Sequence, residues 1–128
     1  MIVLDASVLI GYLDANDAHH DRAVALLSRE IDEDFGVNLL TLAEVLVAPT
    51  RLGKRDTVLG IVDGLGVETL PFPAGSAVML AEIRAETQLR MPDCCLLLSA
   101  RDRRARVASF DERILKTARL LGMDVADA

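Results

Sequence analysis

Two patterns of apolar residues alternate along the chain. Short runs of branched apolar side chains, such as Ile2 to Leu4, are typical of buried strands. Stretches in which apolar residues recur every three or four positions, such as Ala23, Leu26 and Leu27, are typical of helices that pack by one face. The pattern predicts strands over residues 2–4, 35–40, 67–72 and 107–110, with a last edge strand over 123–126. It predicts helices over residues 7–10, 22–31, 41–52, 55–65, 77–89, 92–100 and 111–121.

This alternation of strands and helices predicts an α/β fold, with a mostly parallel central sheet covered by helices on both faces. The sequence contains no repeat, low-complexity tract or linker rich in Pro, Gly and Ser, so residues 1–128 are expected to form a single domain. Pro49 is expected to end or kink the helix in which it lies. The adjacent Cys94 and Cys95 lack disulfide or zinc spacing and are expected to be small core residues in a reducing compartment.

Acidic residues recur at the junctions between predicted strands and helices: Asp5, Glu44, Asp93 and Asp111. Three of them have an ordinary structural explanation. Glu44 forms a capping-box pattern with Thr41. Asp93 follows Pro92 in a first helical turn, and Asp111 suits an N-cap. Asp5 has the weakest alternative, because Ser7 could cap the next helix without its help.

The four carboxylates have a stronger explanation when they are considered together. Parallel strands have their carboxyl ends at one edge of the sheet, so these side chains are expected to converge there. Two carboxylates about 5 Å apart repel each other by roughly 3 kcal/mol at an effective dielectric constant near 20. A divalent cation removes that repulsion, and a set of carboxylate oxygens suits Mg²⁺ or Mn²⁺ better than zinc. Such ions activate water and stabilise charge during attack on a phosphodiester.

Four segments of the sequence, VLDASVLI, TLAEVL, MPDCCLLLSA and ASFDERIL, carry these acidic residues. They resemble the four acidic motifs of PIN-domain ribonucleases, and in particular those of the VapC toxins of bacterial toxin–antitoxin pairs. The resemblance runs over essentially the whole chain, in the same order and with similar spacing. Ser7 and Ser109 match positions where that family tends to carry Ser or Thr near the metal. Cys94 and Cys95 depart from the small residues, such as Ala, that are usual beside the third acidic position.

The resemblance implies a PIN-like three-layer sandwich and Mg²⁺-dependent endoribonuclease activity, with Mn²⁺ as a substitute and a tRNA or rRNA loop as the target. It implies that Asp5 and Asp93 are the principal metal ligands, and that Asp111 supports the metal directly or through water. Glu44 would orient or deprotonate the attacking water. It also implies a cognate antitoxin, and self-association as a homodimer.

The antitoxin is expected to lay an apolar helix in a groove and to present an Arg or Lys to the carboxylates. Four apolar residues of the early helices are the predicted groove: Val24, Leu27, Leu42 and Leu46. The mean hydropathy of +0.32 favours either such an interface or a generous core. A free-standing monomer in which all these residues are core is the alternative.

The net charge of −6 excludes a protein held on nucleic acid by broad positive charge alone. A basic run after the most apolar helix could contact RNA phosphates or could simply be solvated: Arg101, Arg103, Arg104 and Arg106. No apolar run approaches the ~20 residues of a membrane span, and Asp5 interrupts the first apolar segment. The chain is therefore expected to be cytoplasmic, without a membrane partner.

Two alternatives belong to other functional classes. Haloacid-dehalogenase-like phosphatases also place a nucleophilic Asp after their first strand, which would be Asp5. They carry a second Asp two positions later, where this chain has Ser7, and no nearby Lys completes their pattern. The second alternative is a PIN-like binding module that has lost catalysis. The intact set of four acidic residues argues against it, because an inactive site need not keep all four charges.

Overall fold

The computed structural model describes residues 1–126. Four short strands and seven helices alternate along this part of the chain. Their order is β1 (Ile2–Leu4), α1 (Ala6–Leu13), α2 (His20–Arg29), β2 (Phe35–Asn38), α3 (Leu39–Arg51), α4 (Arg55–Gly64), β3 (Val67–Leu70), α5 (Ser76–Thr87), α6 (Met91–Arg103), β4 (Arg106–Ala108) and α7 (Glu112–Leu120).

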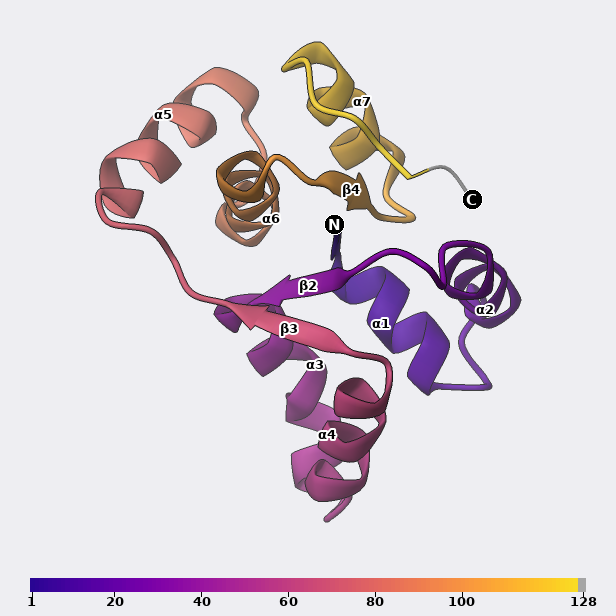
Figure 1. Cartoon of the computed structure of the whole chain (residues 1–128). Coiled ribbons are helices and arrows are strands. Elements are labelled where there is room, and N and C mark those ends of the chain that lie inside the picture. The colour runs from indigo at the N-terminus through magenta and orange to yellow at the C-terminus, as the bar shows by residue number, and fades with distance from the viewer. Residues whose placement is uncertain (127–128) are drawn as a thin grey trace.

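The strands form one parallel sheet in the order β3-β2-β1-β4, which Figure 1 shows between two groups of helices. The chain adds strands on one side of β1 as far as β3 and then returns to add β4 on its other side. The order therefore reverses between β1 and β4. In open α/β sheets, ligands bind beyond the carboxyl ends of the strands at such a reversal point.

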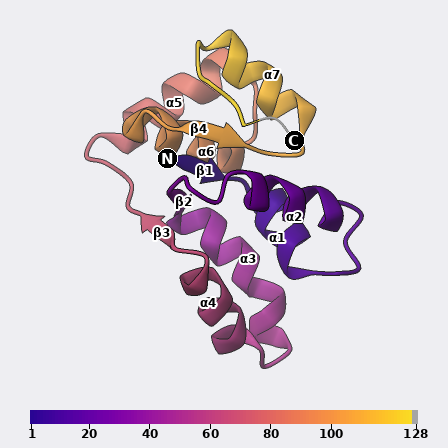
Figure 2. The same ribbon diagram turned by 45° about the vertical axis from the view of Figure 1, so that its right-hand side comes forward.

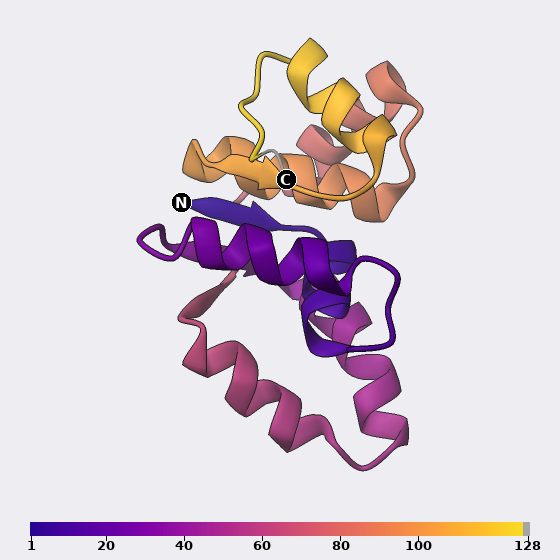
Figure 3. The same ribbon diagram turned by 90° about the vertical axis from the view of Figure 1, so that its right-hand side faces the viewer.

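Each face of the sheet packs against its own layer of helices, so the predicted three-layer α/β arrangement is confirmed. Neighbouring residues of β1 point to opposite faces, as strand geometry requires. Val3 packs among residues of α5, α6 and α7, whereas Ile2 and Leu4 pack among residues of α1, α2 and α3. Figures 2 and 3 show β1 and β4 lying between these two groups of helices.

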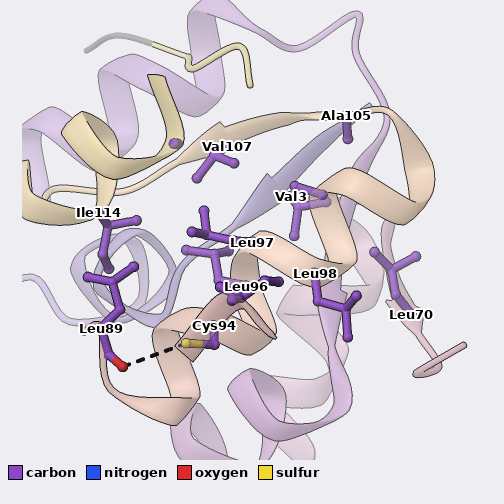
Figure 4. Close-up of a cluster of buried hydrophobic side chains, with 13 residues drawn as sticks. Val3, Leu70, Leu89, Cys94, Leu96, Leu97, Leu98, Ala105, Val107 and Ile114 are labelled. Atoms are coloured by element: carbon purple, nitrogen blue, oxygen red, sulfur yellow. Dashed lines mark hydrogen bonds between the residues drawn. The ribbon is translucent and has the colours of Figure 1, made fainter. Parts of the chain in front are cut away.

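Helix α6 forms the centre of the first layer. All of its residues from 93 to 100 are buried, so this helix is enclosed on every side rather than amphipathic. Figure 4 shows Leu97 of α6 close to Val107 of β4, with Leu96 below it and Ile114 of α7 to one side. The Cys94 thiol lies 3.6 Å from the Leu89 carbonyl oxygen, and burial raises the pKa of the thiol. The prediction that the two cysteines are core residues is confirmed, since both are free and buried.

Several element boundaries differ from the sequence prediction. Helix α3 does not end at Pro49 but continues to Arg51. It also begins at Leu39, two residues before the predicted start, because Asn38 rather than Thr41 caps it. The predicted edge strand over 123–126 is reduced to one parallel bridge between Val125 and Val107. No helix in residues 1–126 is long and apolar enough to span a membrane.

Gly36 is the position in the sheet where a side chain cannot be added without displacement. A Cβ atom there would lie 2.8 Å from Leu70 Cδ1 and 3.0 Å from Met1 Sδ, because these two side chains pack against the buried strand β2. We expect Gly36→Ala to lower the free energy of unfolding by about 1–3 kcal/mol, as overpacking of a core does. Urea or thermal unfolding measures the change.

Gly60→Ala is the matched control. Gly60 lies in the exposed part of α4, and no heavy atom stands within 4 Å of the position its Cβ would take. Alanine is the better helix former there, so the free energy of unfolding should rise by up to about 1 kcal/mol. If Gly36→Ala is as stable as the Gly60 variant, the close approach of β2 and Leu70 described above is wrong.

Candidate active site

The Asp5 carboxylate lies at the point where the strand order reverses, directly after β1. Its Oδ1 accepts a hydrogen bond from the Ala6 backbone N–H at 2.9 Å and so caps α1. Its Oδ2 accepts hydrogen bonds from the Ser7 hydroxyl at 2.8 Å and from the Ser109 hydroxyl at 2.7 Å. The expectation that Ser7 caps α1 is therefore wrong: Asp5 caps its own helix, and Ser7 holds Asp5.

The segment between β4 and α7 closes this network from the other side. The Phe110 backbone N–H donates to the Ser7 hydroxyl at 3.1 Å, and the Asp111 N–H donates to the Ser109 hydroxyl at 3.0 Å. Each serine hydroxyl thus accepts from one segment and donates to Asp5. Asp111 caps α7 by accepting from the Arg113 N–H at 2.9 Å, so its predicted N-cap role is confirmed.

Asn38 ends β2, the strand on the other side of β1 from β4. Because Val3 of β1 lies opposite Gly36 of β2, the register brings Asn38 beside Asp5. The Asn38 Oδ1 accepts from the Thr41 N–H at 2.8 Å and caps α3. The predicted capping box of Thr41 and Glu44 is therefore wrong. Glu44 lies in the second turn of α3, where its carboxylate is not used to start the helix.

Asp93 enters the site from the first turn of α6, as predicted, and only 6% of its surface is exposed. Its Oδ2 atom is buried and has no hydrogen-bond partner among the described residues. The nearest cation is Arg90, whose Nε lies 3.8 Å from that oxygen. An anionic oxygen without hydrogen bonds is costly to bury, and native proteins rarely leave one. The position is suited to an external cation.

The four carboxylates repel one another electrostatically, and this repulsion affects the pKa values of Asp93 and Glu44. Burial raises the pKa of Asp93, the charges of Asp5 and Asp111 raise it further, and Arg90 opposes them. Desolvation of its carboxyl group raises the pKa of Glu44, although the residue as a whole is exposed, and the charges of Asp5 and Asp93 add to this rise. Carboxylates from four separate segments therefore share one region at the carboxyl edge of the sheet.

The chemistry of these ligands fits a hard divalent cation, since every available donor is a carboxylate oxygen. As the side chains stand, however, no group of three or more His, Cys, Asp or Glu within residues 1–126 is arranged so that it could hold a metal ion. The orphaned Asp93 oxygen and the mutual repulsion favour cation binding.

The basic run predicted to contact RNA lies elsewhere. Helix α6 carries Arg101, Arg103 and Arg104 at its other end, roughly 15 Å along the axis from Asp93 at 1.5 Å per residue. Arg106 begins β4 at the amino edge of the sheet and pairs with Glu30 at 2.8 Å. Arg103 pairs with Glu68 at 2.9 Å. RNA contacts by these four arginines stay a prediction, but they would be remote from the carboxylates.

A groove lies on residues other than the predicted Val24, Leu27, Leu42 and Leu46, and the position of the antitoxin stays a prediction. Leu27 is only 2% exposed and belongs to the core, whereas Val24 is exposed and Leu42 packs against the core. A groove of about 470 Å³ instead runs between α1, α3 and the start of α4, with Glu44 on its wall. Its apolar lining is formed by Ile10, Leu13, Val45, Ala48, Pro49, Leu52 and Val58.

Two features of the site were not found from the sequence. Arg90 and Arg113 each stand 3.8 Å from a site carboxylate, Asp93 and Asp111 respectively. The spacing of Arg90 and Asp93, three positions apart at a helix start, was an available signal. The contacts of Phe110 could not be predicted from the sequence, because its neighbours His19 and Arg22 come from a distant segment. Its ring lies 5.1 Å from the His19 ring and 4.6 Å from the Arg22 guanidinium carbon.

The sequence also matches a family model, described as the PIN domain, over residues 2–120. The chain belongs to the PIN domain family. No curated protein sequence matches it significantly. The family match favours a nuclease site over the phosphatase alternative, in which Asp5 would be a nucleophile.

Solved structures of other proteins share the PIN fold over nearly the whole chain. FitAcB from Neisseria gonorrhoeae aligns with a TM-score of 0.76 and 24% identity, covering 99% of this chain and 97% of that one. The VapC20 toxin of Mycobacterium tuberculosis aligns at 0.71 and 16% identity, covering 91% and 94%. DNA-bound VapBC from Salmonella typhimurium aligns at 0.70 and 18% identity, covering 97% and 95%. At these identities the similarity establishes the fold.

The raised pKa values predict how the stability of this PIN domain depends on pH in the absence of metal. Folding raises the pKa of Glu44 above 4.5 and that of Asp93 above 3.8, so the folded state binds these protons more tightly. Their ionisation therefore destabilises the fold, and that penalty disappears as the pH falls through the raised values. In EDTA, the melting temperature should therefore be higher at pH 5 than at pH 7.

Asp93→Asn and Glu44→Gln are the variants that test this origin. Both should melt higher than the wild type at pH 7 and show a flatter pH profile. Asp5→Asn should behave in the opposite way and melt lower, because its amide nitrogen cannot accept the bonds that the carboxylate receives. A wild-type melting temperature that falls from pH 7 to pH 5, with the same slope in Asp93→Asn and Glu44→Gln, would contradict the prediction.

Proposed function

We propose that this PIN domain is a metal-dependent endoribonuclease and the toxin of a toxin–antitoxin pair, acting in the cytoplasm. The observation that carries the proposal is the meeting of Asp5, Glu44, Asp93 and Asp111 at the reversal point of the sheet. A fold gains no stability from gathering like charges, so their presence together favours a role that needs a cation. This also argues against a binding module that has lost catalysis.

Asp5 and Asp93 are the proposed principal metal ligands, with Asp111 supporting the ion directly or through water. Bound Mg²⁺, or Mn²⁺ in its place, would lower the pKa of a water molecule and neutralise charge on the phosphodiester. Glu44, whose pKa is raised by desolvation and by the charges of Asp5 and Asp93, is suited to orient that water and accept its proton. Ser7 and Ser109 keep the Asp5 carboxylate in one orientation through their hydroxyl donors.

The proposed substrate is a loop of structured RNA, in tRNA or rRNA. One similar structure, VapC20 of Mycobacterium tuberculosis, is described as a toxin that cleaves the sarcin–ricin loop. This chain has a net charge of −6, so it lacks a broad basic surface for RNA. Recognition would depend on the cation and on arginines near the carboxylates, such as Arg113 beside Asp111.

The first test is RNA cleavage by the purified chain. EDTA should abolish cleavage, and added Mg²⁺ or Mn²⁺ should restore it. Asp5→Asn, Asp93→Asn and Glu44→Gln should each lower the rate at least about 100-fold, since each removes a ligand or base that acts in the transition state. Asp111→Asn keeps the α7 cap and should lower it less, because Asp111 supports the metal from one side.

Phosphate release from a small phosphoester is the control reaction, because a phosphatase would perform it and a phosphodiesterase would not. Circular dichroism of each variant shows whether the fold is retained. Cleavage that continues in excess EDTA, or full activity in Asp93→Asn, would overturn the proposal. Sequencing of cleaved RNA ends from cells expressing the chain would identify the target loop.

The proposed protein partner is a small antitoxin that occupies the apolar groove. The similar VapBC and FitAcB structures support such a partner, as does a solved complex described as a toxin–antitoxin pair from Klebsiella pneumoniae. Because Glu44 lies on the groove wall, a chain seated there reaches the carboxylates directly. An Arg or Lys from it would replace the charge of the metal. A homodimer is also expected, as in the family.

Leu52 tests the position of the antitoxin. Its side chain lines the groove and is 69% exposed, so Leu52→Asp should leave the fold intact and weaken antitoxin binding at least about 10-fold. The matched control is Leu120→Asp on α7, since Leu120 is 77% exposed and lies outside the groove lining. Co-expression with the neighbouring small open reading frame, followed by size exclusion and an RNase assay, provides the measurement. Equal inhibition of both variants would place the antitoxin elsewhere.

A further inference from the structure

Arg90 has no structural task at the start of α6. It is the N-cap residue of the helix, but its side chain makes no capping hydrogen bond, and 75% of that side chain is exposed. A positive charge at a helix N-terminus opposes the helix dipole, so Arg90 does not stabilise α6 electrostatically. The preceding residue, Leu89, is buried and fixes the backbone at this point. The backbone of Arg90 is therefore held in place by its neighbour, while its side chain is exposed and is not needed to cap the helix.

The guanidinium group of Arg90 lies near the carboxylates of the site. Its Nε lies 3.8 Å from the Asp93 Oδ2 atom, which is the buried oxygen without a hydrogen-bond partner. The positive charge of Arg90 opposes the rise in the pKa of both Asp93 and Glu44. Arg90 therefore acts on carboxylates of two different helices, α6 and α3, rather than on one surface neighbour.

Arg113 provides a contrast at the same distance. It lies 3.8 Å from Asp111 Oδ2, but the Asp111 side chain is 36% exposed, so water can solvate that oxygen. The Asp93 side chain is only 7% exposed, and water reaches it far less. Of the two arginines, Arg90 therefore faces the carboxylate that most needs a counter-ion.

We infer that Arg90 is a built-in counter-ion of the carboxylate cluster, which pairs with Asp93 in the metal-free protein and competes with a divalent cation for it. The inference rests on the proposed function only in taking the cation to be the catalytic one. A cation bound to Asp93 would coordinate its carboxylate and take the place of the guanidinium as counter-ion, so one electrostatic partner would replace the other. The arginine is a positioning residue that sets metal affinity.

The test is a calorimetric titration of the full chain with Mg²⁺ or Mn²⁺, without RNA. Arg90→Gln should bind the ion roughly fivefold more tightly, which corresponds to the loss of one unit charge about 4 Å away in a largely aqueous medium. In EDTA the same variant should melt about 2–4 °C lower, because Asp93 loses its counter-ion. Arg90→Lys keeps the charge and should stay close to the wild type in both measurements.

Two further variants distinguish this role from a general effect of surface charge. Arg55→Gln removes another exposed arginine, paired with Asp56 at 3.1 Å on α4, and should change neither metal affinity nor the metal-free melting temperature. In an Asp93→Asn background, Arg90→Gln should no longer lower the melting temperature, as a double-mutant cycle requires of a direct pair.

The outcomes separate the inference from the proposed function. If the wild type binds the ion and Arg90→Gln binds it with unchanged affinity, the inference is overturned and the nuclease proposal stands. If the wild type binds neither Mg²⁺ nor Mn²⁺, both are overturned. If Arg90→Gln and Arg55→Gln tighten binding equally, the effect is one of net charge, and Arg90 has no special position.

Discussion

The hydrogen bonds to the Asp5 carboxylate are the interaction on which the rest of the site depends. Three donors from two distant parts of the chain meet on this group: the Ala6 N–H, the Ser7 hydroxyl and the Ser109 hydroxyl. They join the first strand and helix to the segment that leads from β4 into α7. Charge-assisted hydrogen bonds of this kind are about twice as strong as neutral ones, and they fix orientation. The carboxylate is thus held rigid before any cation or substrate arrives.

The sheet topology decides why this network stands at the centre of the molecule. Because the strand order reverses between β1 and β4, the chain leaves these two neighbouring parallel strands toward opposite faces of the sheet, with α1 after β1 and α7 after β4. The buried helix α6 fills the layer above and brings Asp93 to the same edge. Stability and chemistry conflict here. The fold must bury Asp93 and bring it near other carboxylates, and the raised pKa values of Asp93 and Glu44 are the physical trace of that conflict.

Helix capping at this edge explains how one sequence serves both structure and site. Asp5 and Asp111 cap α1 and α7 with one carboxylate oxygen each, while the second oxygen of Asp5 accepts from Ser7 and Ser109 and that of Asp111 lies 3.8 Å from Arg113. Asn38 caps α3 and so releases Glu44 from the capping box that its sequence suggests. A capping role and a role in the site are therefore compatible in the same residue, as Asp5 and Asp111 show.

The sequence by itself determined the α/β class, the order of the strands and helices along the chain and the four acidic residues, because these depend on local periodicity and on residue type at strand ends. It did not determine the boundaries that depend on caps, such as the start of α3 at Leu39, since Asn38 and Thr41 are both good cap residues. Only the tertiary structure decided that Arg90 faces Asp93, that Leu27 is core, and that the basic run from Arg101 to Arg106 lies at the opposite edge of the sheet. Those outcomes depend on how α6 and the early helices pack on the sheet. Packing is a property of contacts between residues far apart in the chain, which local sequence patterns do not encode.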